Sequence, residues 1–330
     1  MKGAASGRWI AWVVQALLLA AIAGGAVWLV LHALGVLRAR GVQSGFDFLL
    51  DPAGFGIGEG WLDFEAGQPY WRAFLAGLIN TLRAAVPASI LAVVFGTLIG
   101  IGRLAPHVLV RGICGAYVQT LRNIPLLVQM LMLYFALTQL LPDSTEAIEL
   151  VRGVWLSKDG LTIPWPVREA GAWWPSHFDW PERSSFNVTG GAALSPEYLT
   201  VVIGLAAYTA AFVAEIVRAG IGSVSQGQKL AAQALGLTPL QQLRIVVLPQ
   251  ALRVIVPSLT NQLLSLTKNS SLAVAVGYPE LMSIANTSFN STGRTFECIA
   301  IIMAVYLALS LSISGAMNFY NARVALRGWQ

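Results

Sequence analysis

The sequence predicts an all-α integral membrane protein with about six transmembrane helices. Of its 330 residues, 56% are hydrophobic and only 11% are charged, and the mean hydropathy is +0.65. An ordinary soluble domain carries about 25% charged residues. Apolar segments of roughly 20 residues, enough to cross a hydrocarbon core of about 30 Å, recur along the chain. The composition therefore excludes a soluble globular protein.

The candidate spans are residues 9–34, 75–101, 113–141, 197–217, 251–276 and 297–319. Pro87 and Pro125 interrupt the second and third, which packed membrane helices tolerate. The first segment has an alternative interpretation, because Ala21-Ile22-Ala23 resembles a signal-peptidase site. We expect a retained helix, since the hydrophobicity continues through Leu34 and is too long for a typical signal.

The charged residues segregate between the two sides of the predicted membrane. If the amino terminus is cytoplasmic, these basic residues fall inside: Lys2, Arg8, Arg103, Arg111, Arg122, Arg218, Lys229, Arg244, Arg253, Arg323 and Arg327. Every Asp and Glu except Glu215 falls outside or at an outer helix end. Since basic loops stay on the cytoplasmic side, we expect both termini in the cytoplasm of a bacterial inner membrane. The net charge of +5 then reflects membrane flanks and not a nucleic-acid surface.

A polar, helix-forming stretch, GQKLAAQALGLTPLQQLRIVVLPQALRVIVP, separates the fourth and fifth segments. Gly236 is a natural helix stop. Thr238 and Gln241 form a capping box with Pro239 at the first helical position, so a second helix should follow at once. We expect that helix to end near Pro249.

The spacing of small and apolar residues in this stretch resembles the signature loop of ABC importer permeases. The matching residues are Ala231, Ala232, Gly236, Leu248 and Pro249. Leu230 replaces the usual glutamate, and Val246 the usual isoleucine. The resemblance implies a coupling helix that sits in a groove on an ATP-binding subunit. The alternative is an amphipathic loop helix with no partner.

Other stretches resemble the polar amino-acid permeases of the histidine/glutamine permease family. They are RNIPLLVQ, AEIVRAG, LTKNSSLA and GYPEL, and with RGVQSGFDFL and AGFGIGEG they point to the general L-amino-acid permease branch. The resemblance covers essentially the whole chain. It implies a type I ABC importer permease-like core of five helices plus an N-terminal helix. Within AEIVRAG, Glu215 lies three residues before Arg218, a helical ion-pair spacing.

Lys268 is the only lysine deep in an apolar segment, and a cation at mid-membrane costs at least about 2.5 kcal/mol. We expect Lys268 to face the translocation pathway, where it meets a substrate carboxylate, with Asn269, Ser270 and Ser271 lining the path. Asn269 replaces the aspartate of the family's LKDTSLA stretch. The alternative is that Lys268 neutralises the carbonyl end of its helix.

The resemblance implies a heterodimer with a sister permease, an ATP-binding subunit dimer and a periplasmic amino-acid-binding protein. The sequence has no GxxxxGK[ST] phosphate loop, so ATP and Mg should bind only to the partner subunits. We expect no catalytic residues, no cofactor and no metal site in this chain, and therefore a transport subunit and not an enzyme. Which amino acids are carried is not encoded in a recognisable motif.

The sequence divides into an N-terminal helix (1–35), a periplasmic loop (36–74), core helices (75–141), a periplasmic insertion (142–196), core helices (197–323) with the coupling loop (219–250), and a cytoplasmic tail (324–330). The insertion is rich in tryptophan: Trp155, Trp165, Trp173, Trp174 and Trp180. We hypothesise that it contacts the external binding protein. The alternative is a cap packed on its own helices. Extra helices, usual here in the L-amino-acid branch, should be missing.

Two other classes of protein remain as alternatives. A self-sufficient secondary transporter or channel would need no ATP, but the interior helices lack the Asp/Glu/His chain of a proton-coupled carrier. A membrane-embedded enzyme is less well supported, because no nucleophile, base or metal set converges in the sequence.

Overall fold

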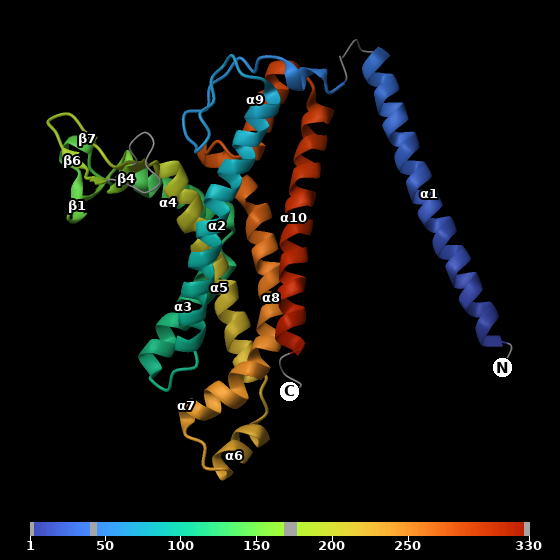
Figure 1. Cartoon of the computed structure of the whole chain (residues 1–330), viewed down its shortest axis with the longest axis vertical. Helices are drawn as coiled ribbons and strands as arrows, with labels where there is room; N and C mark the ends of the chain where they lie inside the picture. Colours follow the sequence, from blue (N-terminus) through green and yellow to red (C-terminus); the bar gives the residue numbers. More distant parts are fainter. Residues whose placement is uncertain (1–2, 40–44, 168–176, 327–330) are drawn as a thin grey trace.

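The computed structural model describes residues 3–39, 45–167 and 177–326. Most of them form a helical bundle with a small β insertion, and the first helix stands apart from the bundle (Figure 1). The helices are α1 (Gly3–Ala39), α2 (Tyr70–Gly102), α3 (Val108–Asn123), α4 (Leu126–Gln139), α5 (Pro196–Gly222), α6 (Gln226–Ala234), α7 (Pro239–Gln241), α8 (Leu248–Asn269), α9 (Leu281–Thr292) and α10 (Thr295–Leu326). Shorter turns are η1 (Asp47–Leu50), η2 (Ser144–Glu146), the π-helix η3 (Gln242–Val247) and the 3₁₀-helix η4 (Ser270–Val276). Lys2, Trp173, Trp174 and Arg327 lie outside the described residues.

The number of predicted spans is confirmed. Among the described residues, α1, α2, α5, the run Pro239–Val276 and α10 are long and apolar enough to cross a membrane, and the bent pair α3 and α4 makes a sixth. Helices suit this role because each satisfies its own backbone hydrogen bonds in lipid. The start of α1 and the end of α10 lie toward the end of the molecule that carries α6 and α7 (Figure 1). We call this the coupling-loop end.

Small residues let α2 and α5 pack backbone to backbone in the core. A Cβ atom added at Gly96 would lie 2.6 Å from Val213 Cβ and 2.8 Å from the carbonyl oxygen of Ala210. One turn on, a Cβ at Gly100 would lie 2.7 Å from the carbonyl oxygen of Ala214. Close approach through glycine is a general means of helix association in membranes. Helices surrounded by lipid gain little free energy from burying apolar surface against each other, so close packing matters more.

The third predicted span, 113–141, is not one helix. It breaks at Ile124 and Pro125, and α3 and α4 meet at 106°. Proline removes the N–H that would continue the helix, and the residue before it is pushed into extended geometry. Gln129 Nε2 then donates to the carbonyl oxygens of Leu121 and Ile124, both at 2.8 Å, and so satisfies groups that the break exposes. By contrast, α2 runs through Pro87 without a break.

The helix predicted to end near Pro249 instead continues into the membrane segment. Gln242–Val247 forms the π-helix η3, and Leu248 and Pro249 occupy the first turn of α8. Proline is tolerated there because the π-helical turn directly before it already interrupts the regular helical hydrogen bonds. The prediction of a helix end at Pro249 was therefore wrong.

A short helix that the sequence analysis did not predict, α9, follows the left-handed Gly277 (φ 85°). Glu280 caps α9 by accepting a hydrogen bond from Ser283 N at 2.9 Å. Its other oxygen accepts from Tyr306 Oη at 3.0 Å, and the glutamate is fully buried. Burial raises the pKa of Glu280 to about 7.

The insertion between α4 and α5 folds as short strands, which the sequence analysis did not predict. They are β1 (Ile148–Val151), β2 (Val154–Ser157), β3 (Gly160–Ile163), β4 (Trp165–Val167), β5 (His177–Asp179), β6 (Glu182–Arg183), β7 (Val188–Thr189) and β8 (Ala192–Leu194). One antiparallel sheet has the order β1-β2-β3-β8, and β4–β5 and β6–β7 pair separately. The described part of the insertion holds no helix beyond the 3₁₀ turn η2, as expected.

We predict that Gly96→Ala destabilises the bundle by about 1–3 kcal/mol, because the added methyl overpacks the α2–α5 contact. Thermal unfolding in detergent measures this. Gly112→Ala on α3 is the matched control, since a Cβ there meets nothing within 4 Å. Equal unfolding temperatures for the two variants would contradict the packing account.

The buried Glu280 should make stability depend on pH. Because its pKa is raised from 4.5 to about 7 in the folded chain, its contribution is most favourable below about pH 4.5 and is lost as the pH rises toward 7. The loss is about 3 kcal/mol as an order of magnitude. Glu280→Gln should remove this part of the pH dependence of unfolding, and Glu182→Gln, at an exposed position, should keep it. An unchanged pH profile in Glu280→Gln would overturn the assignment.

Candidate functional site

The coupling loop is a compact, capped structure. Ser225 Oγ accepts from Gln228 N at the start of α6, and the predicted capping box of Thr238 and Gln241 is present in both directions. Gly236 ends α6 with φ 75°, a left-handed conformation that suits glycine. Leu237 N then donates to the carbonyl oxygen of Ala232 at 3.1 Å. The chain therefore turns tightly between α6 and α7.

Large apolar side chains of this loop face solvent. Figure 1 shows α6 and α7 beyond the end of the helical bundle. Leu230 is 62% exposed, Leu235 81% and Leu240 72%. We call the exposed side chains of Leu230, Leu235, Leu240, Leu243 and Ile245 the coupling patch. Exposed apolar side chains that lie together on a protein surface are typical of an interaction site.

The residues predicted to couple the chain to a partner divide into two groups. Ala231, Gly236, Leu248 and Pro249 are exposed. Ala232 is 3% exposed and holds α6 against η3, where Val247 is also buried. Ala232 thus supports the loop from within, and a partner would meet the other four.

Glu215, in the last turns of α5, forms the predicted ion pair with Arg218 of the same helix, whose Nε lies 3.1 Å from Oε1. The structure adds a second partner, because Arg103 at the end of α2 also forms an ion pair with Glu215. Sequence spacing revealed the local partner, whereas Arg103 is distant in the chain. The three side chains tie the end of α2 to the last turns of α5.

The predicted pathway residues lie where α8 gives way to η4. Lys268 is exposed, and no ion pair involves it among the described contacts. Asn269 and Ser271 are half-buried, and Ser271 Oγ donates to the carbonyl oxygen of Lys268 at 2.9 Å. Ser270 is fully buried and donates to the carbonyl oxygen of Thr267 at 2.7 Å, so its hydroxyl does not line an open path in this conformation.

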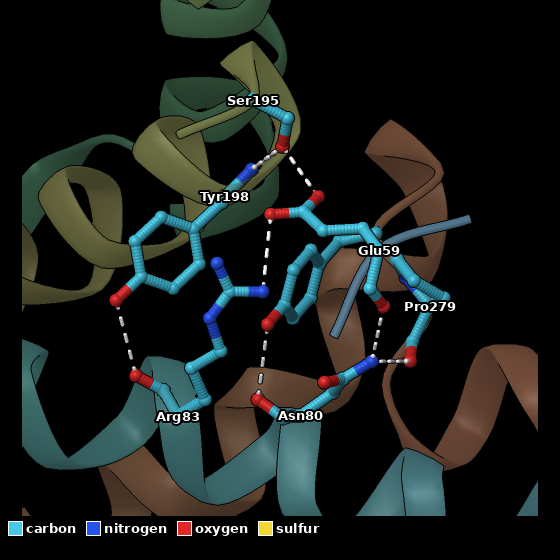
Figure 2. A network of polar contacts seen from close by, with 7 residues as sticks. Glu59, Asn80, Arg83, Ser195, Tyr198 and Pro279 are labelled. Carbon is cyan, nitrogen blue, oxygen red and sulfur yellow. Dashed lines mark hydrogen bonds and ion pairs between the residues drawn. The ribbon is translucent and has the colours of Figure 1, made fainter. Parts of the chain in front are cut away.

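A polar network joins α2 and α5 to the loops that precede α2 and α9 (Figure 2). Asn80 Nδ2 donates to the carbonyl oxygens of Glu59 and Pro279, both at 2.9 Å. Tyr278 Oη donates to the carbonyl oxygen of Asn80 at 3.2 Å. One amide on α2 therefore joins the loop before α2 to the loop before α9.

An ion pair extends the same network to α5. Arg83 Nη1 lies 3.3 Å from Glu59 Oε1, although the pair lacks hydrogen-bond geometry. The guanidinium stacks on Tyr198 at 4.6 Å, and Ser195 Oγ donates to Glu59 Oε2 at 2.5 Å. The sequence analysis did not identify this network, because the partners of Arg83 lie far from it in the chain.

A hollow of about 420 Å³ lies beside this network. It is lined by Phe55, Gly56, Ile57, Gly58, Glu59, Ser195, Glu197, Gly277, Pro279, Ser283, Ile284 and Thr287. No group of three His, Cys, Asp or Glu side chains able to hold a metal occurs among the described residues. The bundle therefore has a polar network with a hollow at one end and exposed apolar side chains at the other.

Comparisons with known proteins agree with this geometry. Residues 92–326 match the family described as binding-protein-dependent transport system inner membrane component. The chain is 38% identical over 370 residues to the putative amino-acid ABC transporter permease protein YhdX of Escherichia coli (strain K12), covering 96% of this chain and 94% of YhdX. It is also 38% identical to the general L-amino acid transport system permease protein AapQ of Rhizobium johnstonii, covering 92% and 89%.

A solved amino acid ABC transporter with histidines superposes with a TM-score of 0.57 at 27% identity, covering 77% of this chain and 95% of that one. The MetNI methionine ABC transporter in an inward-facing conformation shares the fold, with a TM-score of 0.52 at 17% identity. The chain therefore belongs to the binding-protein-dependent transport system inner membrane components and, within them, to the amino-acid ABC transporter permeases.

Proposed function

We propose that this chain forms half of the translocation pathway of an ATP-driven importer for L-amino acids and couples that pathway to ATP-binding subunits. The observation that carries the proposal is the coupling patch on α6 and α7, which is apolar, rigidly capped and free to meet a partner. Because the caps hold α6 and α7 in a fixed geometry, a displacement of the coupling patch should move the neighbouring helices α5 and α8 with it. ATP and Mg bind on the partner in this scheme.

Ala231, Gly236, Leu248 and Pro249 meet the ATP-binding subunit, and Ala232 braces them. Closure of the ATPase pair pushes α6 and α7, and the push passes through Glu215 to Arg103 and the end of α2. Opening of the Glu59, Asn80 and Arg83 network at the opposite end would then admit substrate. We therefore place the coupling-loop end in the cytoplasm and the network on the periplasmic side of a bacterial inner membrane.

Further subunits complete the proposed importer. A sister permease supplies the second half of the pathway, in keeping with paired relatives such as the glutamate/aspartate import permease proteins GltJ and GltK of Escherichia coli. A periplasmic amino-acid-binding protein delivers the substrate to the mouth beside the hollow and the β insertion. Lys268, unpaired within the described chain, offers its ammonium to the substrate carboxylate, and Asn269 and Ser271 line the path beside it.

The coupling patch gives the first test of the proposal. Leu235→Asp should reduce co-purification of the ATP-binding subunit and lower ATP-dependent uptake at least about tenfold, because it places a charge in an apolar interface. Leu235 is 81% exposed, so the fold should survive. Phe186→Asp, at an 86% exposed position in the β insertion, is the matched control for co-purification, and it should leave recovery of the ATP-binding subunit unchanged. Normal uptake by Leu235→Asp would contradict the proposal that the coupling patch binds the ATP-binding subunit.

Lys268 gives the second test, on the substrate pathway. Lys268→Met should lower uptake of amino acids about tenfold or more, since it removes the charge that meets the carboxylate, while assembly with the other subunits stays normal. Lys268→Arg keeps the charge and should retain part of the uptake. If Lys268→Met transports as well as wild type, Lys268 is not part of the substrate pathway, and its charge only neutralises the carbonyl groups at the end of α8.

A further inference from the structure

We propose that the chain carries a binding site for an anionic phospholipid between α2, α3 and α5, near the coupling-loop end. A hollow of about 360 Å³ lies there, lined by Arg103, Val118, Gln119, Arg122, Asn123, Phe212 and Glu215. The transport cycle described above uses Arg103 and Glu215 but leaves the rest of this hollow without a role. Its lining contains arginine and amide side chains, whose N–H groups can donate hydrogen bonds to a phosphate.

The charge of the hollow is unbalanced. Glu215 is shared by Arg103 and Arg218, so its negative charge is already matched twice. The guanidinium of Arg122 lies 5.0 Å over the ring of Phe212, and this is its one contact among those of the described residues. Arg103, Arg122 and Glu215 are the charged side chains that line the hollow, and they leave it a net positive charge of +1, with Arg218 outside the lining as a second partner of Glu215. A phosphodiester is the kind of anion that arginine binds best, through paired N–H donors.

Neutral donors converge on the same place. The side-chain amides of Gln119 and Asn123 line the hollow and make no hydrogen bond among the described contacts. Each can donate to a phosphate or glycerol oxygen. Phe212 and Val118 form an apolar floor, which keeps water away from part of the site and strengthens each charged hydrogen bond.

A second hollow, of about 230 Å³, supplies a place for an acyl chain. It is lined only by apolar side chains and Tyr117, namely Leu91, Phe95, Ile99, Tyr117, Ile203, Ala206, Ala207 and Ala210. It lies against the same three helices, and Ile99 precedes Arg103 by one turn at the end of α2. Exposed Leu104, Val108 and Leu109 flank Arg103 in the chain, which places the basic hollow at the membrane surface. A basic pocket between helices with an apolar groove above it fits a lipid and not a soluble phosphate.

The test uses the chain with its co-purified subunits in lipid nanodiscs, and native mass spectrometry counts the lipids that stay bound. Wild type should retain phosphatidylglycerol in preference to phosphatidylethanolamine. Arg122→Gln should weaken that retention about fivefold to tenfold, because one arginine–phosphate contact is lost. Arg111→Gln, an exposed arginine on the same helix, should leave it unchanged. Equal retention of the two lipids, or equal losses in the two variants, would overturn the proposal.

Two further arms distinguish a lipid from a soluble anion. Ile203→Trp adds bulk at a 43% exposed position in the apolar groove, and it should weaken phosphatidylglycerol retention without affecting the fold. Inorganic phosphate at millimolar concentration should not raise the unfolding temperature of wild type more than that of Arg122→Gln. A phosphate effect that depends on Arg122, with normal lipid retention by Ile203→Trp, would overturn the lipid assignment in favour of a soluble anion. Thermal unfolding without added lipid confirms that each variant is folded.

Discussion

The close contact between α2 and α5 is the constraint on which the rest of the structure depends. Gly96 and Gly100 bring the two backbones together, and no side chain larger than hydrogen fits at either position without displacement of its neighbours. In lipid, such packing replaces the apolar burial that holds a soluble core together. At one end of this helix pair Arg103 reaches Glu215, and at the other Arg83 stacks on Tyr198. The two helices are therefore held together by close backbone packing in the middle and by a polar contact at each end.

This arrangement explains how a push at one end could be felt at the other. The coupling loop is capped by Ser225, Thr238 and Gln241, and η3 carries it without interruption into α8. Rigid elements with discrete contacts transmit displacement, while the loops around them absorb it. The left-handed Gly277 and the buried Glu280 then connect η4 to α9 and the polar network around Asn80. In the proposed cycle the coupling loop is the part that is pushed, and this network is the part that opens.

Much of the fold could be predicted from local patterns. Apolar length indicated the spans, and the spacing of Thr238 and Gln241 indicated the capping box. The angle at Pro125 could not be predicted, because proline permits a kink but neighbouring helices set its size. The strands of the insertion are two to four residues long, too short for a periodic signal. By contrast, α9 carries apolar residues at helical spacing, Leu281, Ile284 and Ala285, which the sequence analysis did not use. The partners of Arg83, Asn80 and Glu215 come from distant segments, and a single sequence does not reveal such pairs.

The central claim is that the coupling patch touches an ATP-binding subunit, and crosslinking from Leu235 tests it most directly. Leu235→Cys would carry a short bifunctional thiol–amine reagent in native membranes, in a background where Cys114 and Cys298 are replaced by serine and alanine respectively. The account predicts a crosslinked product that contains an ATP-binding subunit, and predicts its loss when the single cysteine is introduced instead by Phe186→Cys in the exposed β insertion. A crosslink only to lipid or to another copy of this chain, with uptake intact, would contradict it.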